Sequence, residues 1–233
     1  MANLDDRALL VLGADGCKGG AWVVAVIDGE GELSWHAAAD TTALLELADE
    51  YEADAVALDV PIGLAPLGAT RSCDVLARQR LGARRSSVFA APPREVLSCS
   101  TYAEARPLAP SLSAQAFGLV PRIREVDELL RAQPAEVHRR VVESHPEVAF
   151  ASMAAGQFDL ATKKSAAGAL QRIALLEELL PEPLPHDVPP FALLDDALDA
   201  AACAMVAHRW ARGEAEVLGN QTDPLGLPMR IVI

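Results

Sequence analysis

The sequence predicts an α/β fold, a single domain over residues 1–233 built on a mixed five-stranded sheet with helices on both faces. Short runs rich in Val, Ile, Leu and Ala alternate with longer segments whose apolar residues recur at helical spacing. A turn signal joins two early runs directly, whereas a helical segment separates another pair, so both antiparallel and parallel pairings are expected. With 233 residues, 51% of them hydrophobic, the chain can bury a sizeable core.

The first three strands are expected near the N-terminus. Ala8–Ala14 is a continuous apolar run that ends at Asp15, a pattern typical of a buried central strand. Two further runs, Ala21–Ile27 and Leu33–Ala38, flank the Asp-Gly-Glu-Gly sequence at 28–31, which is a hairpin signal. We therefore expect three antiparallel strands.

A helix and a fourth strand follow. Thr41 or Thr42 can cap a helix that continues through Glu50, with leucines on one face. Asp54–Leu58 is then a short apolar run that ends at Asp59. Because this run is reached through a helix, we expect it to pair in parallel with the first strand. Three strands, a helix and a fourth strand in this order are the opening of a ribonuclease H-like domain.

The rest of the chain is predicted to be mostly helical. A helical insertion is expected after the fourth strand, at about 65–135, with helices at Ser72–Leu81 and 121–133. A fifth strand is expected at Val141–Val142. The C-terminal part is predicted to contain two long helices and a terminal edge strand, at Ala166–Leu180, Leu194–Arg212 and Arg230–Ile233.

Composition limits the classes of partner. The formal charge of −13 argues against a protein coated with basic surface, so a nucleic-acid partner would need a local basic patch. We expect no signal peptide, because no basic segment precedes an apolar one at the N-terminus, and no membrane span. The four separated cysteines are expected to be reduced thiols of a cytoplasmic protein. The oligomeric state stays open, a dimer included.

Two aspartates follow predicted strands. Asp15 precedes a glycine-rich turn and would be a hard oxygen ligand for Mg²⁺ or Mn²⁺, or alternatively a turn residue that caps its own loop. Asp59 lies in an apolar stretch just before Pro61, where a charge is costly unless it is paired or bound to a metal; the alternative is a solvated aspartate at the strand end. If the first and fourth strands are parallel neighbours, the two carboxylates emerge side by side.

The last long helix begins with further aspartates. Asp195 and Asp196 can be explained by capping and by favourable charge in the first turn. Asp199 instead lies among Ala and Leu residues, where an unpaired carboxylate is expensive. Asp196 and Asp199 are spaced i, i+3 and share one helical face. Facing the strand-end aspartates, they would repel them unless a divalent cation were bound.

Basic residues supply candidate phosphate ligands. Residues 70–94 contain six arginines against one acidic residue, and Arg84, Arg85 and Ser86 offer guanidinium and hydroxyl donors. Lys163 and Lys164, at the start of another helix, could also bind phosphate. The alternative for both groups is a solvated helix surface with ordinary salt bridges.

The segment after the fifth predicted strand is ambiguous. Glu143 could be a further metal ligand or a base that acts through one, and His145 could shuttle protons. A purely structural turn explains the same residues equally well.

The chain resembles a bacterial and archaeal family of predicted nucleases with a ribonuclease H-like fold, the uncharacterised domain of unknown function 429. The similar segments are GADGCKGGAWVVA, ALDVPIGL, ARQRLGARRSSVFAAPPRE, ESHPEVAF, KKSAAGALQR and DDALDAAACA. The last one is also similar to the final motif of RuvC-type resolvases. The resemblance implies that Asp15, Asp59, Asp196 and Asp199 hold two metal ions. Such resolvases usually carry Glu on the fourth strand, so the shorter Asp59 can shift the metal or require Glu143.

The leading hypothesis is a metal-dependent phosphodiesterase, a nuclease or nucleotide hydrolase that uses two Mg²⁺ or Mn²⁺ ions. The same residues leave two alternatives open. One is a non-catalytic binding protein with this fold. The other, less favoured, is a phosphotransferase of the actin and sugar-kinase type, which normally needs two such domains.

Overall fold

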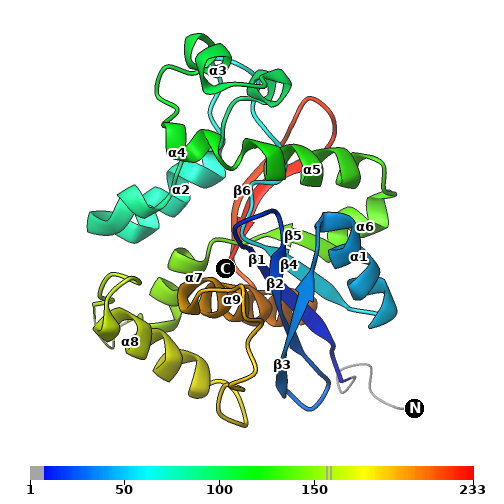
Figure 1. The fold of residues 1–233 in the computed structure, drawn as a ribbon, viewed down its shortest axis with the longest axis vertical. Helices are drawn as coiled ribbons and strands as arrows, with labels where there is room; N and C mark the ends of the chain where they lie inside the picture. The colour runs from blue at the N-terminus through cyan, green and yellow to red at the C-terminus, as the bar shows by residue number, and fades with distance from the viewer. Residues whose placement is uncertain (1–7, 156, 158) are drawn as a thin grey trace.

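The computed structural model describes residues 8–155, 157 and 159–233 and contains a mixed five-stranded sheet of order β3-β2-β1-β4-β5 (Figure 1). This confirms the predicted α/β class, and the strand order is consistent with a ribonuclease H-like fold. The strands are β1 Val11–Gly16, β2 Trp22–Ile27, β3 Leu33–Ala38, β4 Ala55–Leu58 and β5 Val141–Glu143.

Helices make up most of the remaining chain. They are α1 Thr41–Glu50, α2 Ser72–Leu81, α3 Tyr102–Leu108, α4 Ala114–Phe117, α5 Val120–Arg131, α6 Ala135–Arg140, α7 Pro146–Met153, α8 Ala166–Glu177 and α9 Leu194–Ala211. Two 3₁₀ helices lie at Gly82–Ser87 and Arg94–Ser98. The segment between β4 and β5 therefore carries α2 to α6, and much of it forms the upper part of the molecule in Figure 1.

The pairing of β1 decides where the strand ends lie. β1 is antiparallel to β2 and parallel to β4, with Ala14 beside Leu58. The N–H of Asp59 donates to the carbonyl of Ala14 at 3.1 Å, which continues this pairing by one residue. The residues that end β1 and follow β4 therefore emerge at the same edge of the sheet.

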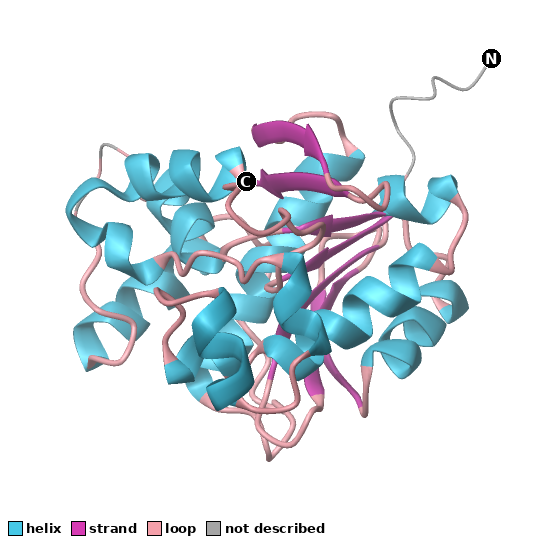
Figure 2. Cartoon of the chain, turned by 90° about the horizontal axis from the view of Figure 1, so that it is seen from above, coloured by secondary structure: helices cyan, strands magenta, loops and turns pink. Residues whose placement is uncertain are grey.

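Helices cover both faces of the sheet, as Figure 2 shows with the strands between two helical layers. Alternate residues of a strand point to opposite faces. Val11 and Ala57 pack in the cluster that contains α7, α8 and α9, whereas Leu12 and Leu58 pack in the cluster that contains α1 and α5. No helix in the described part of the chain is both long and apolar enough to cross a membrane.

The predicted C-terminal strand is present, and it is an edge strand of a separate two-stranded sheet. β7 (Pro228–Val232) pairs with β6 (Val217–Thr222) in a separate two-stranded sheet, linked to the main sheet by one bridge between Ser144 and Val232. β6 escaped prediction because the second half of it is polar and lacks alternation. Asp223 stabilises the intervening turn by accepting the N–H groups of Leu225 and Leu227.

Helix α9 lies directly against β1 because Gly13 has no side chain. A Cβ at this position would lie 2.6 Å from Cα of Ala204 and closer still to the Ala204 nitrogen and the Ala200 oxygen, all of them backbone atoms. The helix presents two small residues at this contact, Ala200 and Ala204, and both are fully buried. The depth at which α9 sits on the sheet therefore depends on this contact.

Gly13→Ala is expected to destabilise the fold by about 3 kcal/mol, because overpacking against backbone cannot be relieved by a rotamer change. The measurement is the free energy of unfolding in urea. Gly118→Ala is the matched control, since Gly118 has a φ of −58° and its Cβ would lie no nearer than 3.1 Å to another atom. Equal stability of the two variants would contradict the close-packing explanation.

Candidate metal centre

Three carboxylates from distant parts of the sequence meet at one edge of the sheet. Asp15 lies near the end of β1, Asp59 directly follows β4, and Asp199 lies in the second turn of α9. One oxygen atom from each lies within 4.8 Å of the other two. The parallel pairing of β1 and β4 brings the first two together, and the packing of α9 on β1 adds the third. This group can hold a metal ion.

The three carboxylates differ in their partners. Asp15 accepts the N–H of Gly16 at 2.7 Å. Asp199 is 1% exposed, its Oδ2 accepts a hydrogen bond from Nζ of Lys163, and its Oδ1 is buried without a hydrogen-bond partner in the described part of the chain. Among the described residues, neither Asp15 nor Asp59 forms an ion pair with a basic side chain. A buried carboxylate oxygen without a hydrogen-bond partner is uncommon, and a bound cation would satisfy it.

Burial and mutual repulsion raise the pKa of all three groups. Burial raises the pKa of Asp59 to about 7, with the charge of Asp199 as the next cause. Burial also raises the pKa of Asp15 well above its ordinary value, followed by the charges of Asp59 and Asp199. The pKa of Asp199 is raised by burial although Lys163 opposes the shift. Without a cation this group favours bound protons, and a cation would compete with those protons.

The donor set fits a hard cation. All three ligands are carboxylate oxygens, and no cysteine or histidine belongs to this group in the described residues. Oxygen-only sites suit Mg²⁺, Ca²⁺ or Mn²⁺ better than softer metals. Oδ1 of Asp199 is buried and has no hydrogen-bond partner in the described chain, so a bound cation would satisfy it.

Asp196 lies beside this group but is not one of its three members. Its Oδ2 accepts the N–H of Leu193 at 3.1 Å and thereby caps α9, while its charge contributes to the raised pKa of Asp15. The neighbouring Asp195 forms an ion pair with Lys164 at 3.0 Å. The structure therefore brings Asp199 to the strand ends and leaves Asp195 and Asp196 at the helix start.

Glu143 ends β5, next to the carboxylate edge, and is buried. It pairs with Arg71, and its Oε2 accepts the N–H of Ile62 at 2.8 Å. Burial raises its pKa to about 7 although Arg71 opposes the shift. Because Ile62 lies three residues after Asp59, Glu143 fixes the loop that carries this aspartate.

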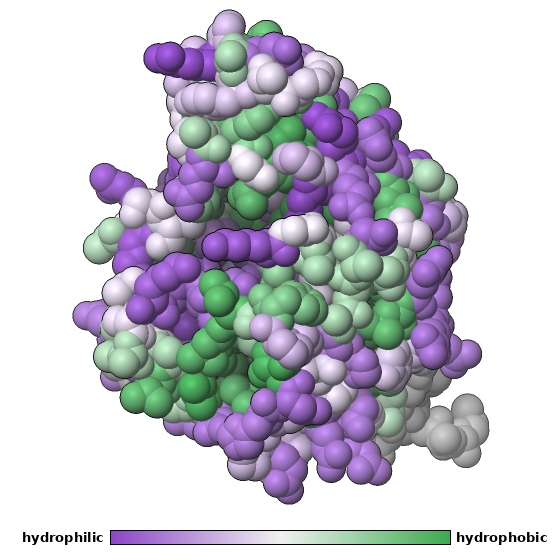
Figure 3. Space-filling view, in the orientation of Figure 1, coloured by the Kyte–Doolittle hydropathy of each residue, from purple (hydrophilic) through white to green (hydrophobic). Residues whose placement is uncertain are grey.

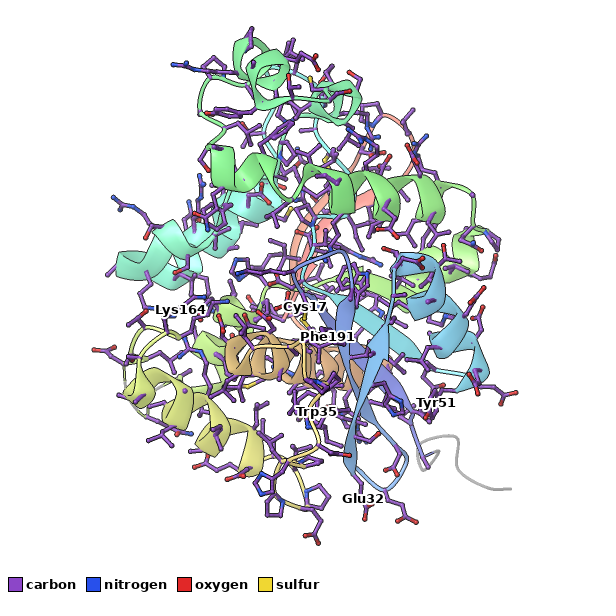
Figure 4. All side chains as sticks on the ribbon, viewed as in Figure 1. Cys17, Glu32, Trp35, Tyr51, Lys164 and Phe191 are labelled. Carbon is purple, nitrogen blue, oxygen red and sulfur yellow. The ribbon has the colours of Figure 1, made fainter. Side chains whose placement is uncertain are left out.

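The carboxylate edge opens into a cavity of about 680 Å³. Asp15, Asp59 and Asp199 lie in its wall, together with residues of the segment after β4 and of the loop before α8. Figure 3 shows this face hollowed between the upper helical segment and the region around α8. In Figure 4, Lys164 lies on the α8 side of this region and Cys17 lies beside β1. A cavity of this size matches small-molecule and cofactor sites.

The predicted phosphate ligands separate into two groups. Arg84, Ser86, Lys163 and Lys164 line the cavity, whereas Arg85 is exposed and is not among the lining residues. The other members of the arginine-rich segment have structural partners in the described chain. Arg71 binds Glu143 and Asp74, Arg78 donates to the carbonyl of Val88, Arg80 pairs with Glu216, and Arg94 pairs with Asp127 and Asp223.

The cavity contains two further polar groups of note. Arg84 pairs with Glu147, which also accepts a bond of 2.6 Å from the buried Arg172. His145 lies in the wall, and burial, together with the charge of Lys163, lowers its pKa to about 4. The imidazole is therefore neutral near pH 7.

Sequence reasoning missed Arg122 of α5. Its Nη2 donates to the carbonyls of Cys17 at 2.8 Å and Ala21 at 3.1 Å, and its guanidinium lies 4.7 Å from the ring centre of Trp22. A Cβ at Gly16 would overlap this guanidinium. Arg122 therefore holds the turn that follows Asp15, but its place in a charged helix gives no sequence signal for this contact.

A family model described as "Protein of unknown function (DUF429)" matches residues 13–223, so the chain belongs to this family. The matched range contains all three carboxylates of the candidate metal centre. No curated protein matches the chain, and no solved structure matches it.

Mg²⁺ or Mn²⁺ at about one hundred times its dissociation constant is expected to stabilise the fold by about 2.7 kcal/mol, because it binds the folded site preferentially. For a chain of this size that corresponds to a rise in Tm of about 5–10 °C. Asp199→Asn should lose most of this rise, whereas Glu46→Gln, an exposed change on α1, should retain it. A metal-independent Tm in the parent protein would refute the site.

The pH dependence of stability provides a separate test. The pKa of Asp59 is about 7 in the folded chain against an ordinary value of 3.8, so the folded state holds this proton more tightly. Its contribution to stability is fully present below about pH 4 and is lost as pH rises to about 7. In EDTA, the Tm of the parent should therefore fall relative to that of Asp59→Asn as the pH rises from about 5 to about 7. Parallel Tm curves for the two proteins would contradict the raised pKa.

Proposed function

We propose that this protein is a metal-dependent phosphodiesterase, a nuclease or nucleotide hydrolase that acts by two-metal-ion hydrolysis. The observation that carries the proposal is the convergence of Asp15, Asp59 and Asp199, with oxygen atoms within 4.8 Å of one another, in the wall of a cavity. Bound Mg²⁺ or Mn²⁺ would supply an activated water and stabilise charge on phosphoryl oxygens. Asp15, Asp59 and Asp199 would hold the metal, and Asp196, whose charge acts on Asp15, would contribute to a second ion.

The charges around the cavity support a divalent cation. In the described chain, Arg71 forms ion pairs with Glu143 and Asp74, Arg84 and Arg172 form them with Glu147, and Lys163 forms one with Asp199. Asp15 and Asp59 alone among the lining acidic groups have no basic partner there. Together these two carboxylates carry the charge that one divalent cation neutralises.

The cavity would favour an anionic substrate only when metal is bound. Six acidic and five basic side chains line it, which gives a formal charge of −1. One divalent cation changes this to +1, and a second makes it more positive. Phosphate binding is then coupled to metal binding, and the overall charge of −13 does not prevent it. Arg84, Lys163 and Lys164 in the wall would bind phosphate oxygens.

His145 and Lys163 have separate roles in this proposal. The neutral imidazole of His145 lies in the cavity wall, and it could take a proton from the attacking water and then pass that proton to the leaving oxygen. Lys163 holds Oδ2 of Asp199 and leaves Oδ1 for a cation. Glu143 would act by positioning the loop after Asp59 through Ile62.

One contact favours a second candidate, a non-catalytic binding protein. Lys163 already supplies a positive charge to the carboxylate group through Asp199. If this ion pair replaces the metal, the cavity would bind a phosphate ligand without turnover. The two candidates differ in metal dependence, because binding by the second would persist in EDTA.

The test is hydrolysis of single-stranded, branched and mononucleotide substrates in Mn²⁺ or Mg²⁺. Asp15→Asn, Asp59→Asn and Asp199→Asn are each expected to lower turnover at least about a hundredfold, since even groups that only support metal ligands contribute 10- to 100-fold. Glu46→Gln is the control and should keep full activity. Turnover that survives in Asp15→Asn, or that persists in EDTA, would contradict the proposal.

A further inference from the structure

The cavity that contains the carboxylates also has an apolar side that the metal centre does not use. Phe89 and Leu119 line this cavity, and their side chains are 48% and 42% exposed. Among the aromatic residues that the structure describes, only Phe89 and Phe191 are exposed, and Phe191 is not in the wall. An accessible phenylalanine therefore lies in the same cavity as the candidate metal ligands.

The backbone on both sides of Phe89 is fixed. The preceding Val88 is 2% exposed, and its carbonyl accepts a bond of 3.0 Å from Nε of Arg78. Two residues after Phe89, the N–H of Ala91 donates to Oδ2 of Asp74 at 3.0 Å. The Phe89 side chain is exposed although hydrogen bonds hold the backbone on both sides of it, so its exposure is not the result of a loose loop. A ring held in this way loses little conformational entropy when a ligand covers it.

The loop of Phe89 is also connected to the carboxylate edge. Asp74, which holds Ala91, forms an ion pair of 3.2 Å with Arg71, and Arg71 pairs in turn with Glu143 at the end of β5. These buried contacts set the position of the ring relative to the strand ends. Arg84 and Ser86, which also line the cavity, belong to the 3₁₀ helix just before Phe89.

We infer that Phe89 is a nucleobase-stacking residue, with Leu119 as a second apolar contact, and that the substrate is a single-stranded nucleic acid or a nucleotide with an unpaired base. This inference rests on the proposed phosphodiesterase function and specifies its substrate class. Aromatic faces beside phosphate-binding cations are suited to unpaired bases, because every base has a π-face and every nucleotide carries a phosphate that the cations can bind. A base within a duplex has both faces covered by its neighbours and would not stack on this ring.

The experiment measures binding of a short oligothymidylate, labelled at its far end, by fluorescence anisotropy in Ca²⁺ at low salt. Phe89→Ala is expected to weaken binding by about 5- to 150-fold, the effect of losing one stacked base, and Phe89→Trp should retain it. Phe191→Ala is the matched control for loss of an exposed phenylalanine and should bind like the parent. An oligomer of the same length without bases should bind the parent and Phe89→Ala equally.

Three results would overturn the inference: no binding of the oligothymidylate by the parent, equal affinity in Phe89→Ala, or an equal loss on the oligomer without bases. Turnover is assayed separately on the same oligomer. Binding that depends on Phe89 without any cleavage would refute the proposed hydrolysis and leave the stacking site in place. Cleavage that is unaffected by Phe89→Ala would refute the stacking site and leave the hydrolysis in place.

Discussion

The contact between β1 and α9 is the constraint on which the candidate site depends. At Gly13 the strand meets the helix backbone at Ala200 and Ala204 with no side chain between them. This close approach is what lets Asp199, on the same helix, reach the carboxylate at the end of β1. A sheet that met α9 through larger side chains would hold Asp199 away from Asp15, and the three oxygens could then not bind one ion together.

The surrounding ion pairs concentrate repulsion at the strand ends. Glu143 and Glu147 lie in the same cavity, but Arg71 and Arg84 compensate them. Asp15 and Asp59 have no such partner among the described residues, and burial and neighbouring carboxylates raise the pKa of both. These ion pairs fix the loops around the cavity. They leave Asp15 and Asp59 uncompensated, and a bound cation would relieve the repulsion between these two carboxylates.

Local patterns were sufficient for most of the fold. The turn at 28–31 indicated the first hairpin, and the helix before Asp54–Leu58 indicated a parallel fourth strand; both pairings are present. The parallel pairing also explains why Asp15 and Asp59 could be expected side by side. β6 and the short helices α3, α4 and α6 were not foreseen, because their sequences carry weak periodicity and their positions depend on contacts with distant segments.

The sequence by itself determined the order of the strands and the acidic residues at their ends, because hydrophobic periodicity and turn residues act over a few neighbouring positions. Only the tertiary structure decided which partner each basic side chain binds. Arg71 pairs with Glu143, which is 72 residues away in the sequence. Arg122 donates to the carbonyl of Cys17, which is 105 residues away, and so holds the turn after Asp15. Such pairings depend on how separate helices and strands pack, and no local pattern in the chain records that packing.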